Sequence, residues 1–289
     1  MRYEGRIFRP PSEAYSLIVQ LTIGCSHNKC AFCDMYKEKT FRVRDLRSVL
    51  DDLSSARSRY DKVKRIFIAD GDALIRKTED WVVLLEFIRT TFPECERVSC
   101  YGSPRSILLK SDEDLKRLYE LGLTLLYVGL ESGSDTVLDT MNKGESVSEI
   151  VDAGLKAKRA GMKLSVTAIS GLGGTELWEE HAIKTGEALS LMKPDYIGLL
   201  TLMVVEGTPL YDKCADGAFE VPNAAAIANE TLLLLENLDS EGSVFRSNHA
   251  SNYLGLKGTL NGDLEAMKGI LREALRGEVG YRDERWRKL

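Results

Sequence analysis

The sequence is poor in cysteine and lacks long apolar runs. Six cysteines in 289 residues are too few for a small scaffold stapled by disulfides. No apolar stretch approaches the roughly 18 residues that a transmembrane helix needs, so the sequence predicts no membrane span. The first eleven residues carry charges and no apolar core, so we expect no signal peptide. These absences favour a reducing, cytoplasmic location.

The sequence also lacks a long basic run. The chain has 39 basic and 44 acidic side chains, which gives a net charge of −5. Proteins that bind bare nucleic acid usually present a basic face, so we expect a small-molecule substrate and no nucleic acid. The basic end, from Arg282 to Lys288, is predicted to be a solvated tail.

Short apolar segments alternate with amphipathic ones along most of the chain. This alternation predicts parallel strands joined by helices, hence an α/β fold with right-handed crossovers. An open sheet and a barrel both satisfy the pattern. The predicted strands are residues 16–23, 65–69, 98–101, 125–130, 164–169 and 196–203. The helical patterns lie at residues 46–53, 81–88, 115–118, 147–155 and 223–238, with a last helix near 262–276.

Three of the six cysteines lie within nine positions, in the loop after the first predicted strand. Cys25, Cys30 and Cys33 form a Cys-x4-Cys-x2-Cys motif. Loops at the carboxyl ends of parallel strands build the active sites of such folds. Three thiolates can ligate three irons of a cubane cluster and leave the fourth iron open to a small molecule. The alternative is a zinc site with His27 as the fourth ligand.

The motif resembles that of the radical S-adenosylmethionine (SAM) superfamily. Members usually show Cys-x3-Cys-x2-Cys with an aromatic residue before the last cysteine. Here the first interval is one residue longer, and Phe32 occupies the aromatic position. The similarity extends over residues 15–211. It is greatest to the branch that contains oxygen-independent coproporphyrinogen oxidases, methylthiotransferases and Elongator-type proteins.

The resemblance implies a fold and a set of cofactors. The fold is a partial (β/α)6 barrel of the TIM type over residues 12–238, followed by a short C-terminal extension, a loop plus a helix, over residues 239–289. The cofactors are a [4Fe–4S] cluster on the three cysteines of the motif and a molecule of SAM.

The same resemblance places SAM contacts at the ends of the later strands. Asp-Gly-Asp at residues 70–72 stands where the family has a glycine-rich segment that receives the SAM ammonium; an acidic turn is the alternative. The segment Gly129-Leu-Glu-Ser-Gly-Ser134 is similar to a G-x-E-S-G-S stretch of that branch. The implied SAM contacts are Phe32, Asp70, Gly71, Asp72, Ser103, Glu131, Lys143, Ser170, Gly171, Leu172 and Gly173.

Two residues are candidates for a catalytic role. Glu131 is predicted to lie at the end of a parallel strand, where the resemblance implies that it meets SAM or the substrate. His249, one of three histidines, lies in the polar run from Arg246 to Tyr253, which we predict folds over the barrel mouth. A plain surface loop is the alternative for that run.

The implied function is reductive cleavage of SAM to methionine and a 5′-deoxyadenosyl radical, which abstracts hydrogen from a substrate. Such an enzyme of the oxidoreductase or lyase type works anaerobically and takes its electron from reduced flavodoxin or ferredoxin. The alternatives are radical methyl or sulfur transfer and a non-catalytic iron–sulfur or heme-trafficking protein.

Overall fold

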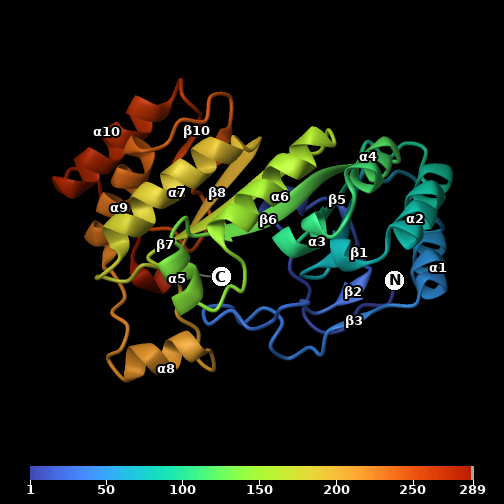
Figure 1. Cartoon of the computed structure of the whole chain (residues 1–289), viewed down its shortest axis with the longest axis horizontal. Coiled ribbons are helices and arrows are strands. Elements are labelled where there is room, and N and C mark those ends of the chain that lie inside the picture. Colours follow the sequence, from blue (N-terminus) through green and yellow to red (C-terminus); the bar gives the residue numbers. More distant parts are fainter. Residues whose placement is uncertain (288–289) are drawn as a thin grey trace. The chain divides into compact units, whose positions relative to one another are not determined.

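The computed structural model describes residues 1–287, which separate into two compact units. Figure 1 labels the elements of both. Three elements, strands β6 and β7 and helix α6, continue from one unit into the other. No helix of the described residues is long and apolar enough to cross a membrane. The first unit comprises Met1–Asn28, Met35–Val128 and Asp152–Leu164; the second comprises Lys29–Asp34, Gly129–Val151 and the chain from Ser165 onward.

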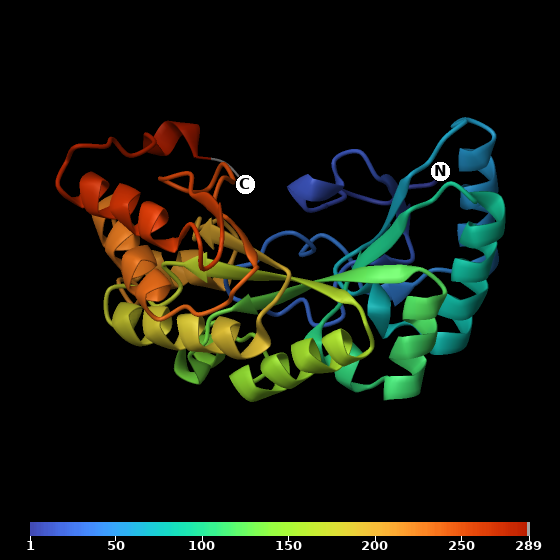
Figure 2. The same ribbon diagram turned by 90° about the horizontal axis from the view of Figure 1, so that it is seen from above.

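The first unit contains a parallel sheet with the hydrogen-bonded order β1-β4-β5-β6. Helices α1 and α2 pack side by side (Figure 2), each with an apolar stripe turned to the interior. The elements that begin in this unit are η1 (Pro11–Glu13), β1 (Leu17–Gln20), β2 (Thr22–Ile23), β3 (Arg42–Val43), α1 (Leu46–Arg57), β4 (Arg65–Ala69), η2 (Ala73–Ile75), α2 (Thr78–Thr91), β5 (Arg97–Tyr101), α3 (Pro104–Leu108), α4 (Asp112–Glu120), β6 (Leu123–Glu131) and β7 (Lys163–Ser170).

The second unit continues with parallel strands β7, β8 and β9, and β10 pairs antiparallel with β9. Helix α7 packs on α9, and α9 packs on α10. Its further elements are α5 (Asp135–Thr140), α6 (Val147–Arg159), α7 (Trp178–Met192), β8 (Tyr196–Thr201), α8 (Pro209–Ala215), α9 (Ala224–Glu236), β9 (Val244–Arg246), β10 (Lys257–Thr259), α10 (Leu264–Leu275) and η3 (Glu284–Trp286).

Five of the six predicted strands match β4 to β8 to within two residues at each end. The strand predicted over residues 16–23 is wrong in its second half. The chain turns at Leu21, whose amide donates to the Ala69 carbonyl while its own carbonyl accepts from the Arg44 amide. Residues beyond Leu21 therefore leave the parallel sheet, and β2 pairs antiparallel with β3.

The sequence prediction omits helix α7. Its buried face includes His181, Thr185 and Gly186, so the apolar stripe that reveals an amphipathic helix is interrupted. His181 and Thr185 are therefore candidates for a specific role, since a buried polar group needs a specific partner.

The C-terminal segment contains two strands, β9 and β10, in addition to the predicted loop and helix. Strand β9 pairs with β8 and extends the sheet beyond residue 238, although the predicted boundary between residues 238 and 239 stays a prediction. The predicted solvated tail is wrong in part. Residues 283–286 are exposed, but Arg287 is buried and Arg282 donates to the carbonyls of His249, Ala250 and Asn252. Lys288 lies outside the described residues.

Candidate functional site

The three motif cysteines lie on the irregular chain between β2 and β3. Each is partly exposed, and none is in a disulfide. Within residues 1–287, no three histidine, cysteine, aspartate or glutamate side chains are gathered into a preformed metal site, and this includes the predicted zinc set with His27. Binding of the metal normally brings such ligands together, because thiolates repel one another without it. An accessible, non-helical loop with three thiols fits insertion of a cluster.

In the first unit, the segment around Cys25 lies against the Asp-Gly-Asp segment. The Gly71 amide donates to the Gly24 carbonyl at 3.1 Å, and the Ser26 hydroxyl donates to Asp72 at 2.5 Å. A Cβ added to Gly71 would lie 2.9 Å from the Cβ of Cys25 and 2.7 Å from the Tyr36 ring. Only glycine fits there, so the sequence at residue 71 is set by the packing of the cysteine loop.

Asp70 is fully buried beneath this loop. Its Oδ2 accepts hydrogen bonds from the Gly24 amide at 3.0 Å and from Gln20 at 3.1 Å. The same oxygen forms an ion pair with Lys39 at 2.8 Å, and the Lys39 side chain is itself only 4% exposed. Asp70 therefore ties both flanks of the cysteine loop, through Gly24 and Lys39, to the end of β4.

Asp72 is also fully buried, and its oxygens are occupied by three serine hydroxyls. Ser103, at the N-cap of α3, donates through its hydroxyl and its amide, and Ser26 and Ser106 donate through their hydroxyls. The predicted pair of Asp72 and Ser103 is thus in contact, but the contact is internal. The acceptors left at residues 70–72 for an ammonium are the main-chain carbonyls and Asp70 Oδ1, which makes no hydrogen bond within the described residues.

In the second unit, Glu131 and Lys143 form an ion pair at 3.2 Å, with each side chain 12% exposed. Burial alone would lower the pKa of Lys143, but the Glu131 carboxylate and the Cys30 thiolate outweigh it and raise the pKa. Lys143 therefore carries its positive charge next to one of the candidate cluster ligands.

The half of the cysteine loop that belongs to the second unit is held by main-chain contacts. The Ala31 amide donates to the Met141 carbonyl at 2.8 Å, and the Asn142 side chain donates to the Lys29 carbonyl at 3.1 Å. These bonds fix Cys30 beside the loop that carries Lys143.

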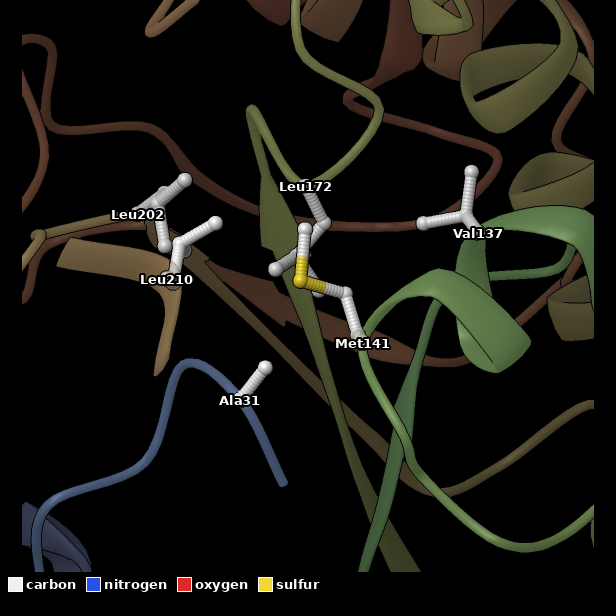
Figure 3. Packing of buried hydrophobic residues seen from close by; sticks show 6 residues of the cluster. All are labelled: Ala31, Val137, Met141, Leu172, Leu202 and Leu210. Carbon is white, nitrogen blue, oxygen red and sulfur yellow. The ribbon is translucent and has the colours of Figure 1, made fainter. Parts of the chain in front are cut away.

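That half of the loop contributes Ala31 to an apolar cluster (Figure 3). The Met141 side chain points toward Leu172, which is 1% exposed, and Phe32 packs against the same cluster. The side chain of Leu172 is therefore part of the core, which leaves only its main chain for the predicted contact with SAM. The cluster consists of Ala31, Val137, Met141, Leu172, Leu202 and Leu210.

The glycine-rich turn after β7 is held by Glu230 of α9, a residue that the sequence analysis does not predict. The Gly171 amide donates to Glu230 at 2.8 Å, and the Ser170 hydroxyl lies 3.4 Å from that of Thr231. Gly173 packs against α7, where an added Cβ would lie 2.8 Å from the Leu177 carbonyl oxygen. Glu230 stands between Ile227 and Leu234 on the apolar face of α9, which is the signal that marks it in the sequence.

His249 lies half-buried at the carboxyl end of β8. Its Nδ1 accepts from the Ser251 amide at 3.1 Å, and burial, with Arg282 nearby, lowers its pKa. Asn252 accepts from the Thr201 hydroxyl at 2.8 Å, so the loop is anchored to β8. Of the predicted residues, the structure brings together Cys25 with Gly71, Asp72 with Ser103, and Glu131 with Lys143, while His249 contacts its own loop.

Comparison with known proteins identifies the family of this chain. The family model described as the Radical SAM superfamily matches residues 19–185, more than half of the chain. A tRNA uridine(34) acetyltransferase of Methanocaldococcus infernus is 22% identical over 235 residues, which cover 68% of this chain and 44% of that protein. The chain therefore spans less than half the length of this relative.

Two solved structures share the fold. The radical SAM methyltransferase TsrM from Kitasatospora setae, with cobalamin and a [4Fe–4S] cluster bound, has a TM-score of 0.57 and 18% identity over 74% of this chain and 43% of that chain. The Methanocaldococcus infernus Elp3 with an N-terminal deletion has a TM-score of 0.53 and 15% identity over 92% and 64%. The predicted α/β fold with a mostly parallel sheet is confirmed.

Proposed function

The chain belongs to the radical SAM superfamily, whose cofactors are a [4Fe–4S] cluster and SAM, and we propose that Cys25, Cys30 and Cys33 hold that cluster. When bound, the cluster supplies one electron that splits SAM into methionine and a 5′-deoxyadenosyl radical. The observation that carries the proposal is the three-cysteine motif inside the matched region, on an accessible loop.

The protein's own groups would orient the reactants. The main-chain carbonyls at residues 70–72 and Asp70 Oδ1 would accept the ammonium of SAM, because Asp70 Oδ2 and both Asp72 oxygens are engaged in holding the loop. Lys143 would place a positive charge beside the thiolate of Cys30 and so partly offset the negative charge of the ligands. Glu131, paired with Lys143 at the end of β6, would face SAM or the substrate.

We propose hydrogen abstraction as the reaction, with the electron delivered by reduced flavodoxin or ferredoxin. The substrate class has two candidates. A small molecule is the expectation from the net charge of −5. A tRNA is favoured by the similarity to a tRNA uridine(34) acetyltransferase, although the similarity covers 44% of that protein.

The test is anaerobic reconstitution of the full chain, which should bind about four irons and four sulfides. Cys30→Ala should abolish iron binding, and Cys95→Ala, outside the motif, should not. With dithionite and SAM, the protein should release 5′-deoxyadenosine and methionine. S-adenosylhomocysteine instead would favour methyl transfer, and a loaded, reduced cluster with neither product would favour the non-catalytic alternative.

Release of 5′-deoxyadenosine also distinguishes the two substrate classes. Stimulation of 5′-deoxyadenosine release by total tRNA, and not by a nuclease-treated metabolite extract, would select tRNA. Stimulation by the extract alone would select a small molecule.

A further inference from the structure

Two titratable residues are buried in the second unit behind the loops proposed to meet SAM. His181 lies on α7 and is 1% exposed; Glu230 lies on α9 and is fully buried. The nearest atoms of the pair, His181 Nε2 and Glu230 Oε1, are 3.6 Å apart. Figure 1 shows α7 and α9 next to each other in this unit. Neither residue has a role in the function proposed above.

Glu230 acts on the turn after β7. Its Oε1 accepts the Gly171 amide at 2.8 Å, and its Oε2 makes no hydrogen bond within the described residues. Burial raises the pKa of Glu230 to about 8, against the lowering effects of the Gly171 amide and the nearby Ser170 hydroxyl. The side chain is therefore a neutral acid at pH 7, and its structural task is to accept one main-chain hydrogen bond.

His181 acts on the segment after β6. Its Nε2 lies 3.1 Å from the carbonyl oxygen of Ile169, which can only accept, so Nε2 carries the hydrogen. Burial lowers the pKa of His181 to about 4, so the ring is neutral and Nδ1 is an acceptor. The Ser132 hydroxyl, 2.8 Å from Nδ1, must donate to it. That leaves the Ser132 oxygen to accept the Ser134 amide at 3.0 Å.

Helix α7 holds the same segment through a second contact. The Gly133 amide donates to the Thr185 hydroxyl at 2.8 Å. A Cβ on Gly133 would lie 2.1 Å from the carbonyl oxygen of Lys184, so no other residue fits there without displacement of the helix. The sequence Glu131-Ser-Gly-Ser134 is therefore shaped by contact with α7 as much as by any ligand.

We propose that His181 and Glu230 are positioning residues that fix the Ser132–Ser134 segment and the Gly171 amide in the geometry required to bind SAM. The inference rests on the proposed function, because it takes Glu131, which directly precedes the Ser132–Ser134 segment, and Gly171 to be SAM contacts. In this arrangement, the side chain at position 230 must supply an uncharged acceptor for the Gly171 amide.

The experiment compares Glu230→Gln, which keeps a neutral acceptor, with Glu230→Leu, which keeps the volume and removes the acceptor. In the full-length protein before reconstitution, hydrogen exchange of peptides that contain Gly171 should accelerate in Glu230→Leu and stay at the wild-type rate in Glu230→Gln. After reconstitution, Glu230→Leu should raise the Kd for SAM about tenfold, the effect of one lost hydrogen bond, with unchanged iron content. Glu230→Gln should stay within about twofold of wild type.

A matched control separates positioning from loss of stability. Leu271→Ala removes a buried side chain of α10, the helix that packs on the α9 helix of Glu230. The inference is overturned if this control, at an equal loss in Tm, weakens SAM binding as much as Glu230→Leu does. It is also overturned if both Glu230 variants exchange alike at Gly171. If the wild type binds no SAM, the proposed function fails, and the exchange rates alone decide whether Glu230 fixes the turn.

Discussion

Replacement of Glu230 by glutamine should change how the stability of the protein depends on pH. The pKa of Glu230 is raised from 4.5 to about 8 by burial. Between these values the folded chain keeps a proton that the unfolded chain has released, so a rise in pH favours unfolding. Each pH unit in this window should lower the free energy of unfolding by about 1.4 kcal/mol. Glutamine does not titrate, so the variant should lack this slope.

His181 contributes a slope of the opposite sign, over a lower range. Burial lowers its pKa from 6.5 to about 4, so in that window the unfolded chain binds more protons and stability rises with pH. The two slopes should nearly cancel between pH 4.5 and 6.5. Above pH 6.5 the Glu230 contribution stands alone. Between pH 6.5 and pH 8 the wild type should therefore lose about 2 kcal/mol of unfolding free energy that Glu230→Gln keeps.

Urea unfolding at pH 6.5 and pH 8, followed by far-UV circular dichroism, measures this difference. Glu187→Gln, at an exposed position of α7, is the control for loss of one surface carboxylate and should follow the wild-type pH profile. The reasoning is refuted if wild type and Glu230→Gln differ by the same free energy at both pH values.

Three further predictions concern the other buried contacts. Lys39→Met should leave Asp70 buried without its cation and cost about 3–5 kcal/mol in urea unfolding, and adding Asp70→Asn should recover part of that loss; no recovery would contradict the ion-pair argument. Glu131→Gln should weaken SAM binding in equilibrium dialysis at unchanged iron content, and an unchanged Kd would assign Glu131 a purely structural role. Arg287→Lys should accelerate hydrogen exchange of the loop at residues 246–253, because one ammonium nitrogen replaces the two guanidinium nitrogens that donate separately to the Ser251 and Leu202 carbonyls; wild-type exchange would show that the loop is stable without this side chain.

The sequence predicts the strands well because buried parallel strands are short apolar runs that local composition reveals. The prediction fails where the local structure depends on a contact with residues distant in sequence. The chain turns at Leu21 because Ala69 and Arg44 are there to bond it, and the tail is ordered because Arg287 reaches the Leu202 carbonyl. Neither contact leaves a periodic signal.

The candidate site shows the same division. The cysteine motif can be found in the sequence because its three cysteines lie within nine residues of one another. The resemblance also predicts a SAM contact at the Asp-Gly-Asp segment, which stays a prediction, but it does not predict that both carboxylates are buried in the protein. His181 and Glu230 escape prediction because their partners lie 49 and 59 residues away and are a hydroxyl and a main-chain amide.

The polar interior of α7 has a consequence for protein engineering. A procedure that ranks substitutions by core packing would replace His181 and Thr185 with aliphatic residues, because such exchanges often stabilise a buried helix. Here they would leave the Ser132 hydroxyl and the Gly133 amide without acceptors inside the protein. A thermostable version of this enzyme should therefore be sought on the exposed face of α7, with its interior left as it is.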